Sequence, residues 1–246
     1  EWYTAWAKGN IVRAESISRA VAAAPKSLRQ TVRATSGVAG LSEYGGRLGQ
    51  AREWQAKSSE ALYRAQPTPA NLLGIAMDSV YFELMYVSKA AGTATVQRAL
   101  ARVPIMSLAP SERPWYNLRN FGVIAKEPKW AREALAGADR DLIPLAADSQ
   151  GVRASFTGAV AFAEGRYEDA IRDFTFSEQR FSTRPRMAAL VRGLAYRELG
   201  RADSAIAAFE QFLAARDATG ELDMQWREPV LQYLGELYEA KGNRAK

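Results

Sequence analysis

Three carboxylates stand close together in the segment "YEDAIRD", residues 167–173: Glu168, Asp169 and Asp173. Two carboxylates on one helix can serve general acid–base chemistry when their environments push their pKa values apart. The neighbouring Arg172 gives the segment the mixed charge of a solvated helix face. The sequence therefore favours a charged outer face here over a catalytic pair.

A second group of acids lies in "GADRDLIPLAADSQG", with Asp139, Asp141 and Asp148. A calcium loop needs oxygen ligands in tight alternation, a central Gly and a closing Glu. This segment has none of that order, so we expect a helix exit and no metal site.

The chain has no His and no Cys, which removes the commonest general base and the usual zinc ligands. Ser-His and Cys-His catalysis are excluded. The sequence also has no Walker-type phosphate loop and no Gly-x-Ser-x-Gly elbow. We expect a protein that is not an enzyme and that holds no cofactor.

The 246 residues carry a net charge of +6, with 25 Arg against 8 Lys. The basic residues are interleaved with acids along the chain, which is typical of solvated helix faces and predicts no nucleic-acid partner. The six Trp residues could stack bases, but their helical spacing favours a core role. No stretch reaches the ~18 uncharged apolar residues of a membrane span.

The positions of these groups follow an internal repeat. "EGRYEDAIRDF" begins at Glu164, and "LGRADSAIAAF" begins at Leu199, 35 residues later. If Gly165 and Gly200 are taken as anchors, each has a Gly seven residues before it, an Ala five residues after it and a Phe nine residues after it. A third copy is anchored at Gly242, with Gly235 seven residues before it and Tyr238 matching Tyr196.

Each of these features has a mechanical reason. Apolar residues at helical spacing predict a first helix from about Val152 to Glu164. The anchor Gly ends that helix, because a left-handed residue costs Gly little. The Ala five residues later lets a second helix approach closely, and Phe174 and Phe209 then fill the space between neighbouring helix pairs.

This pattern resembles the tetratricopeptide repeat, a helix-turn-helix unit of about 34 residues. The matching positions are Gly158, Gly193, Gly235, Tyr196, Tyr238, Ala170, Ala205, Phe174 and Phe209. The resemblance implies an all-α fold, a right-handed superhelix (solenoid) of about seven helical hairpins in which the first and last are incomplete.

Upstream the resemblance continues in a degenerate form. The proposed anchors are residues 9, 46, 92, 126, 165, 200 and 242. Lys126-Glu127-Pro128 replaces the glycine turn of the fourth unit, and in the third unit Gln97 takes the small-residue position after Gly92. We therefore divide one continuous solenoid into degenerate repeats at 1–110 and clearer repeats at 111–246. Pro and Gly mark "AQPTPAN", "SLAPSERP" and "ARDATGELDMQWREP" as loops between units.

The two ends lead us to expect a fragment of a longer chain. Glu1 enters a first helix midway, and Lys246 falls where the last second helix would begin, after a helix expected from Pro229 to Ala240. The alternative is that the two open ends dock on neighbouring subunits.

In the tetratricopeptide family the first helix of each pair lines a concave groove that holds partners. The family's offsets, counted back from each anchor, place partner-binding residues at Arg113, Tyr116, Asn120, Phe162, Leu190, Leu194, Arg197, Gln232 and Glu236. This mixed apolar and polar strip suits an extended peptide or a partner helix.

The sequence thus predicts a non-enzymatic scaffold for protein–protein interaction, similar to the repeat regions of bacterial signalling and regulatory proteins. The alternative is a structural subunit that forms homo-oligomers by stacking end to end. A chain without Cys tolerates either redox environment. The compartment stays open, with the cytoplasm slightly favoured and the periplasm or exterior allowed by an upstream signal or membrane span.

Overall fold

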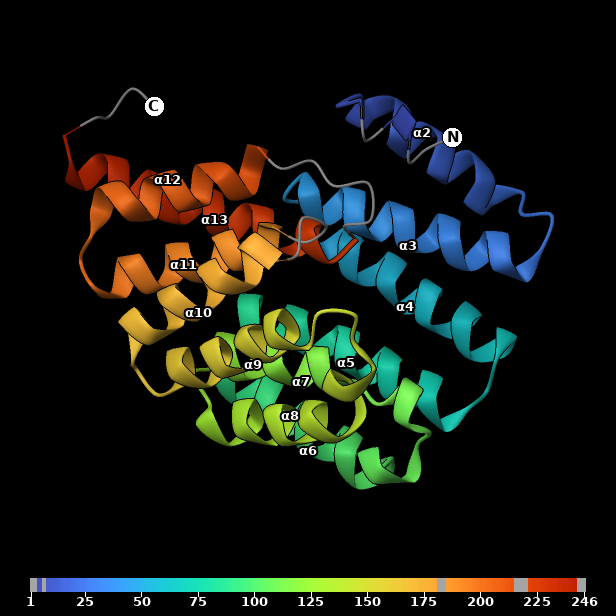
Figure 1. Cartoon of the computed structure of the whole chain (residues 1–246). Coiled ribbons are helices and arrows are strands. Elements are labelled where there is room, and N and C mark those ends of the chain that lie inside the picture. Colours follow the sequence, from blue (N-terminus) through green and yellow to red (C-terminus); the bar gives the residue numbers. More distant parts are fainter. Residues whose placement is uncertain (1–3, 6–7, 181–184, 215–220, 243–246) are drawn as a thin grey trace. The chain divides into compact units, whose positions relative to one another are not determined.

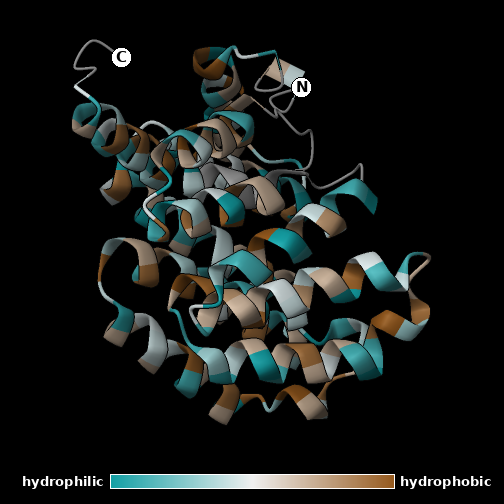
Figure 2. Ribbon diagram, turned by 60° about the vertical axis from the view of Figure 1, so that its left-hand side comes forward, coloured by the Kyte–Doolittle hydropathy of each residue, from teal (hydrophilic) through white to brown (hydrophobic). Residues whose placement is uncertain are grey.

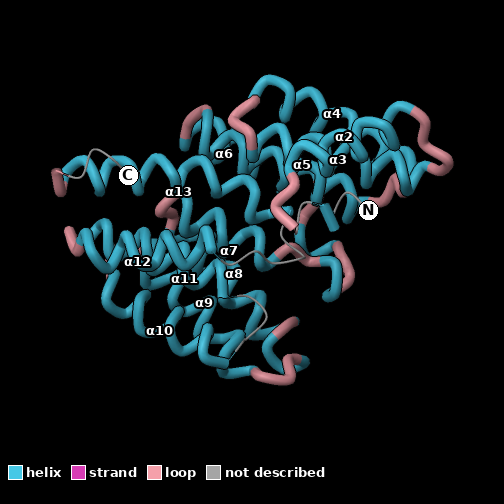
Figure 3. Tube along the Cα trace, turned by 90° about the horizontal axis from the view of Figure 1, so that it is seen from above, coloured by secondary structure: helices cyan, strands magenta, loops and turns pink. Residues whose placement is uncertain are grey.

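The structure is a computed structural model that describes residues 4–5, 8–180, 185–214 and 221–242. Every regular element in these ranges is a helix, and none of them forms a strand (Figure 3). The prediction of an all-α chain is confirmed.

Twelve α-helices and three short 3-10 helices follow one another along the described chain (Figure 1). The α-helices are α2 (Ile11–Ala23), α3 (Leu28–Tyr44), α4 (Leu48–Ala65), α5 (Pro69–Tyr86), α6 (Lys89–Arg102), α7 (Trp115–Ile124), α8 (Pro128–Asp141), α9 (Ser149–Ala163), α10 (Tyr167–Arg180), α11 (Pro185–Glu198), α12 (Ala202–Ala214) and α13 (Glu221–Ala240). The 3-10 helices η1 (Ile105–Ser107) and η2 (Pro110–Glu112) precede α7, and η3 (Ile143–Leu145) follows α8.

The helices divide between two compact units. Unit 1 comprises Glu1–Ile75 and Arg216–Tyr233, and unit 2 comprises Ala76–Ala215 and Leu234–Lys246. The division into degenerate repeats at 1–110 and clearer repeats at 111–246 describes how regular the repeats are in sequence, and it stays a prediction.

Within each unit, helices that follow one another in the chain pack as neighbours. In unit 1, α2 packs on α3 and α3 on α4. In unit 2 each helix from α7 to α12 packs on the next one along the chain. The helix α7 also contacts α9, the first helix of the next pair. Figure 2 shows hydrophobic and hydrophilic residues alternating along these helices, as expected when one face is buried.

The turns inside the hairpins confirm six of the seven anchors. Gly9, Gly46, Gly165, Gly200 and Gly242 have φ between 68° and 77°, and Lys126 has φ 48°. At the fifth anchor the Gly165 N–H donates to the Phe162 carbonyl at 3.0 Å, and the Arg166 N–H donates to the Ala161 carbonyl at 2.8 Å. This is the Schellman arrangement that satisfies the last carbonyls of a helix, and it requires a left-handed residue.

The prediction that Gly92 is the turn residue of the third unit is wrong. Gly92 lies inside α6 and is buried. A Cβ atom at this position would lie only 2.4 Å from Leu84 Cδ2 of α5, so no larger residue fits without a shift. Gly92 is therefore the small residue that lets α5 and α6 approach, and the turn lies about five residues earlier, at Val87 and Ser88. Gln97, expected at the small position, is exposed.

The other small positions behave as expected. They are fully or almost fully buried, and they are Ala14, Ala51, Ala131, Ala170 and Ala205. Phe174 belongs to a core cluster that includes Ala159 of α9, Ala170 of α10 and Val191 of α11, so it fills the space between neighbouring helix pairs.

The first helix of the fifth unit, α9, lies within three residues of its predicted bounds. The last helix is longer than predicted: α13 begins at Glu221 and continues through Pro229, so the second half of the expected loop is helical. Trp226, Val230 and Leu234 are buried at a spacing of four residues. This apolar stripe continues upstream of Pro229, and its packing outweighs the proline's tendency to start a helix.

Candidate functional site

The predicted partner-binding residues all lie on the first helices of their pairs or directly before one. Tyr116 and Asn120 are on α7, Phe162 is on α9, Leu190, Leu194 and Arg197 are on α11, Gln232 and Glu236 are on α13, and Arg113 lies between η2 and α7. Their side chains have very different exposure, which decides what each can touch.

Three of the nine are buried. The exposed fraction is 8% for Asn120, 2% for Phe162 and 0% for Leu190. The Phe162 and Tyr167 rings form a T-shaped pair with centroids 5.4 Å apart. These residues hold helices together, so a partner would reach them only after the helices separate.

Arg113 is also engaged inside the protein. Its Nη1 donates to both carboxylate oxygens of Asp141, at 2.9 and 2.8 Å, and its Nε donates to the Leu108 carbonyl. The side chains of Arg113 and Asp141 are only 10% and 4% exposed. The pair fastens the chain before α7 onto the end of α8.

Asp141 accepts three further hydrogen bonds, from Trp115 Nε1 at 2.8 Å, from Arg140 Nε at 3.1 Å and from Arg140 Nη2 at 3.3 Å. Burial by itself raises the pKa of this carboxyl group, but the hydrogen bonds from Arg113, Arg140 and Trp115 outweigh burial and hold the pKa at about 2. Asp141 is thus a buried structural anion, and the helix exit expected from the sequence is the correct interpretation.

The exposed part of the predicted strip lies on α11 and α13. Arg197 Nη2 donates to Glu236 Oε2 at 2.8 Å, and the two side chains are 36% and 46% exposed. Gln232 lies one turn before Glu236 and is exposed, and Leu194 lies three residues before Arg197 and is half-buried. We call the Leu194, Arg197 and Glu236 side chains of unit 2 the α11–α13 face.

Tyr116 is half-buried and stacks across the α7–α9 boundary, with its ring centroid 5.2 Å from that of Phe156. The structure therefore places Tyr116 against Phe156 of α9 and Arg197 against Glu236 of α13. Leu194 packs against the core cluster that includes Phe162 and Val191.

Sequence reasoning missed a buried polar cluster next to Tyr116. Arg119 is 7% exposed, and it donates to Asn120 Oδ1 at 2.8 Å and to Ser155 Oγ at 3.0 Å. Asn120 Nδ2 donates to the Tyr81 hydroxyl at 3.0 Å. Burial raises the pKa of the Tyr81 hydroxyl, so this hydroxyl stays protonated.

One signal in the sequence marks this cluster. Arg119 stands seven residues before the Lys126 anchor, where the later repeats have Gly158 and Gly193. In those repeats a Phe ring covers the glycine. Here the Arg119 guanidinium lies 5.0 Å from the Tyr116 ring centroid and 5.2 Å from that of Phe156.

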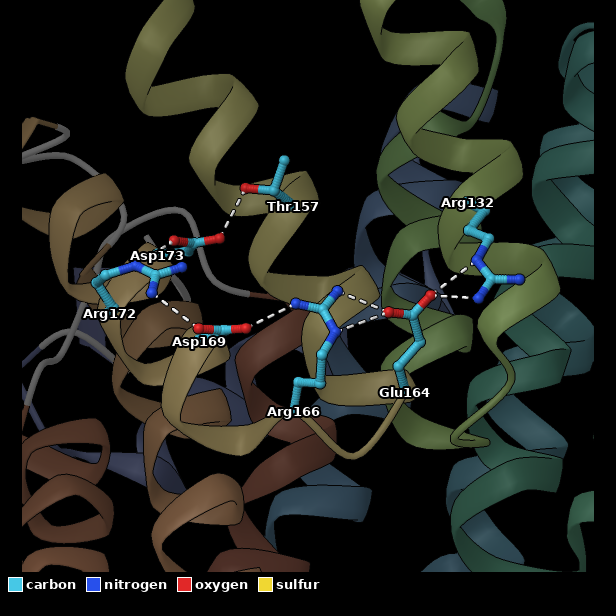
Figure 4. A network of polar contacts seen from close by, with 7 residues as sticks. All are labelled: Arg132, Thr157, Glu164, Arg166, Asp169, Arg172 and Asp173. Carbon is cyan, nitrogen blue, oxygen red and sulfur yellow. Dashed lines mark hydrogen bonds and ion pairs between the residues drawn. The ribbon is translucent and has the colours of Figure 1, made fainter.

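Two of the three carboxylates with which the sequence analysis began, Asp169 and Asp173, lie in a chain of alternating charge (Figure 4). Asp169 accepts from Arg166 at 2.7 Å and from Arg172 at 2.8 Å, and Asp173 accepts from Arg172 and from Thr157. Hydrogen bonds from Arg166 and Arg172 lower the pKa of Asp169. A general acid near neutral pH needs a raised pKa, so this arrangement favours the predicted charged face.

The same network reaches the preceding repeat through Glu164, which accepts from Arg166 and from Arg132 Nε at 2.8 Å. Equivalent ion pairs join other consecutive hairpins, between a second helix and the turn of the next pair: Glu15 with Arg47, Glu168 with Arg201 and Asp203 with Lys241. Such repetition fixes the register of one hairpin against the next.

Within the described ranges, no group of three or more acidic side chains could hold a metal ion. None of the described helices is long and apolar enough to cross a membrane.

No protein-family model matches this chain, and no curated protein matches it at a significant level.

Proposed function

We propose that the chain is a non-enzymatic scaffold of the tetratricopeptide type, a right-handed solenoid that binds an extended peptide or a partner helix. The observation that carries the proposal is the α11–α13 face. There, two adjacent first helices present the Arg197–Glu236 pair, at 2.8 Å, beside the half-buried Leu194. The face thus offers a charged pair and one apolar side chain, a combination of polar and apolar contacts that peptide-binding surfaces also use.

The repeated turn supports the same proposal. Left-handed residues at Gly165 and Gly200 and small residues at Ala170 and Ala205 recur at equal spacing. Hairpins built alike present equivalent faces of their first helices, which is how repeat proteins build extended binding surfaces.

The test uses two double variants that leave the net charge unchanged. Arg197→Ala with Glu236→Ala removes the exposed pair of the α11–α13 face. Arg201→Ala with Glu168→Ala removes another exposed pair, in which Arg201 Nη1 donates to Glu168 Oε2 at 3.2 Å across the turn ends of neighbouring hairpins.

Peptides enriched from a random phage-displayed library against the unsubstituted chain should bind the first variant more weakly than the second. Equal binding by both variants, with unchanged thermal stability, would contradict the assigned face. Failure to enrich any peptide would contradict peptide binding itself.

The alternative is that the chain stacks end to end into homo-oligomers, and size-exclusion chromatography of the same protein distinguishes it from the proposed scaffold. Size-exclusion mass that rises with concentration would favour stacking, whereas a constant monomer mass would exclude it.

A further inference from the structure

The positive charge of the chain is concentrated near its start. Residues 1–75 contain ten Lys and Arg but five Glu and no Asp, so they carry five of the six net positive charges. The remaining 171 residues are almost neutral. The segment Arg216–Tyr233 of the same unit has two Arg and four acids, so unit 1 as a whole carries +3, the same as unit 2. The excess of positive charge lies on the stretch that forms α2, α3 and α4, and a partner with negative charge is attracted to these helices locally.

Few of these cations have an acidic partner within the protein. In the described part of residues 1–75, Arg19 and Arg47 pair with Glu15, and Arg64 pairs with Glu60. The other seven cations form no ion pair there: Lys8, Arg13, Lys26, Arg29, Arg33, Arg52 and Lys57. In unit 2, by contrast, most described arginines are held by carboxylates, as in the network of Figure 4.

Three of the seven form a strip along one edge of α3. Arg29 and Arg33 are four residues apart on the helix, so they share a face, and Lys26 lies just before the N-cap residue Ser27. All three are exposed. The nearest acid along α3 is Glu43, ten residues beyond Arg33 and buried. We call Lys26, Arg29 and Arg33 the α3 basic strip.

We propose that the α3 basic strip binds a peptide segment of a protein partner that carries acidic residues at alternate positions. The inference rests on the proposed function as a peptide-binding scaffold and adds a second binding surface, in unit 1, with the chemistry of the segment that it binds. Carboxylates would accept hydrogen bonds from the two guanidinium groups, which match a carboxylate in planar, bidentate geometry.

The alternate spacing follows from geometry. Residues four apart on a helix are separated by about 6 Å along its axis. In an extended peptide, residues two apart point to the same side and are separated by about 6.6 Å. An extended peptide with Glu or Asp at every second position therefore aligns one carboxylate with Arg29 and the next with Arg33.

The test measures fluorescence anisotropy of two labelled peptides of equal composition and charge. One is Gly-Glu-Ser-Glu-Ser-Glu-Ser-Gly, with alternating acids, and the other is Gly-Ser-Ser-Glu-Glu-Glu-Ser-Gly, with adjacent acids. The alternating peptide should bind more tightly, and 300 mM salt should weaken its binding because exposed charges are screened.

The variant Arg29→Gln with Arg33→Gln should weaken binding of the alternating peptide about tenfold, since each exposed ion pair contributes about threefold. The matched control is Arg52→Gln with Lys57→Gln, which removes from α4 two exposed cations that form no ion pair, although Lys57 Nζ lies 4.3 Å from the centroid of the Trp54 ring. The control should lose less than about twofold, because it changes only the general field. Circular dichroism melting confirms that both variants fold.

Equal loss in the two variants would overturn the proposal, because it would show nonspecific attraction. Tighter binding of oligo(dT) or of phosphatidylserine vesicles, lost in the α3 variant, would overturn it in favour of a nucleic-acid or lipid surface. If the binding of library peptides requires Arg197 and Glu236 but does not require Arg29 and Arg33, the inference fails while the proposed function stands.

Discussion

The ring of Phe209 on α12 lies directly over Gly193 on α11, so close that a Cβ atom on Gly193 would be 2.5 Å from its Cδ1 and Cε1 atoms. Phe174 and Gly158 have the same relationship one repeat earlier, at 2.9 Å. Both glycines lie inside helices, where Gly is normally unfavourable, so the space for the ring explains their presence.

Gly193→Ala should therefore destabilise the protein although Ala is the better helix former. The added methyl group forces the Phe209 ring aside, and overpacking of this kind costs about 1–3 kcal/mol. The measurement is the free energy of unfolding in urea.

Gly235→Ala is the matched control. Gly235 occupies the same repeat position on α13, and a Cβ atom there would meet nothing within 4 Å. This substitution should stabilise the protein by up to about 1 kcal/mol through helix propensity alone. A loss of stability at Gly235 equal to that at Gly193 would refute the packing explanation.

Stability should fall in acid because of Asp141. Its pKa is about 2 in the folded protein and about 3.9 when unfolded. The lowered pKa therefore contributes about 2–3 kcal/mol above pH 4, and this contribution is lost as the pH falls from about 4 to about 2. The measurement is the free energy of unfolding from pH 7 to pH 2, compared with that of Asp141→Asn.

Asp141→Asn should cost about 2–4 kcal/mol near pH 7, because it leaves Arg113 buried beside a neutral group. The difference from the unsubstituted protein should shrink toward pH 2. Glu60→Gln, which removes an exposed pair with Arg64, should change stability little at any pH. A constant difference between Asp141→Asn and the unsubstituted protein would contradict the assigned pKa.

Lys126 is the one described residue other than Gly with a left-handed backbone. Replacing it by Gly relieves a cost of about 1 kcal/mol, but it also removes the Lys126–Glu198 ion pair at 2.7 Å. The substitution is therefore best made in the Glu198→Gln background, where Lys126→Gly should raise the melting temperature. Gly165→Ala should lower it, because Ala at φ 77° is strained. If Lys126→Gly and Gly165→Ala shifted the melting temperature in the same direction, backbone strain would not be the cause.

The position of Gly92 can be tested against that of Gln97. Gly92→Ala should destabilise the protein by about 1 kcal/mol, since the new methyl group meets Leu84. Gln97→Ala should be close to neutral, because Gln97 is exposed on α6. If Gly92→Ala were as stable as the unsubstituted protein, the close approach of Leu84 to this position would be contradicted.

The sequence by itself determined the all-α class, the hairpin repeat and six of its turns. These features depend on local requirements: helical spacing of apolar residues, and a left-handed residue at Gly165 and its equivalents. Each can be recognised from a few neighbouring residues without knowing what the helices touch.

Only the tertiary structure decided which side chains are available. Family offsets cannot tell that Asn120, Phe162 and Leu190 are buried while Arg197 and Glu236 are exposed. Exposure depends on which neighbouring helices cover each face, and those helices come from other repeats. The same holds for Pro229, which stays inside α13 because residues before and after it pack into a core.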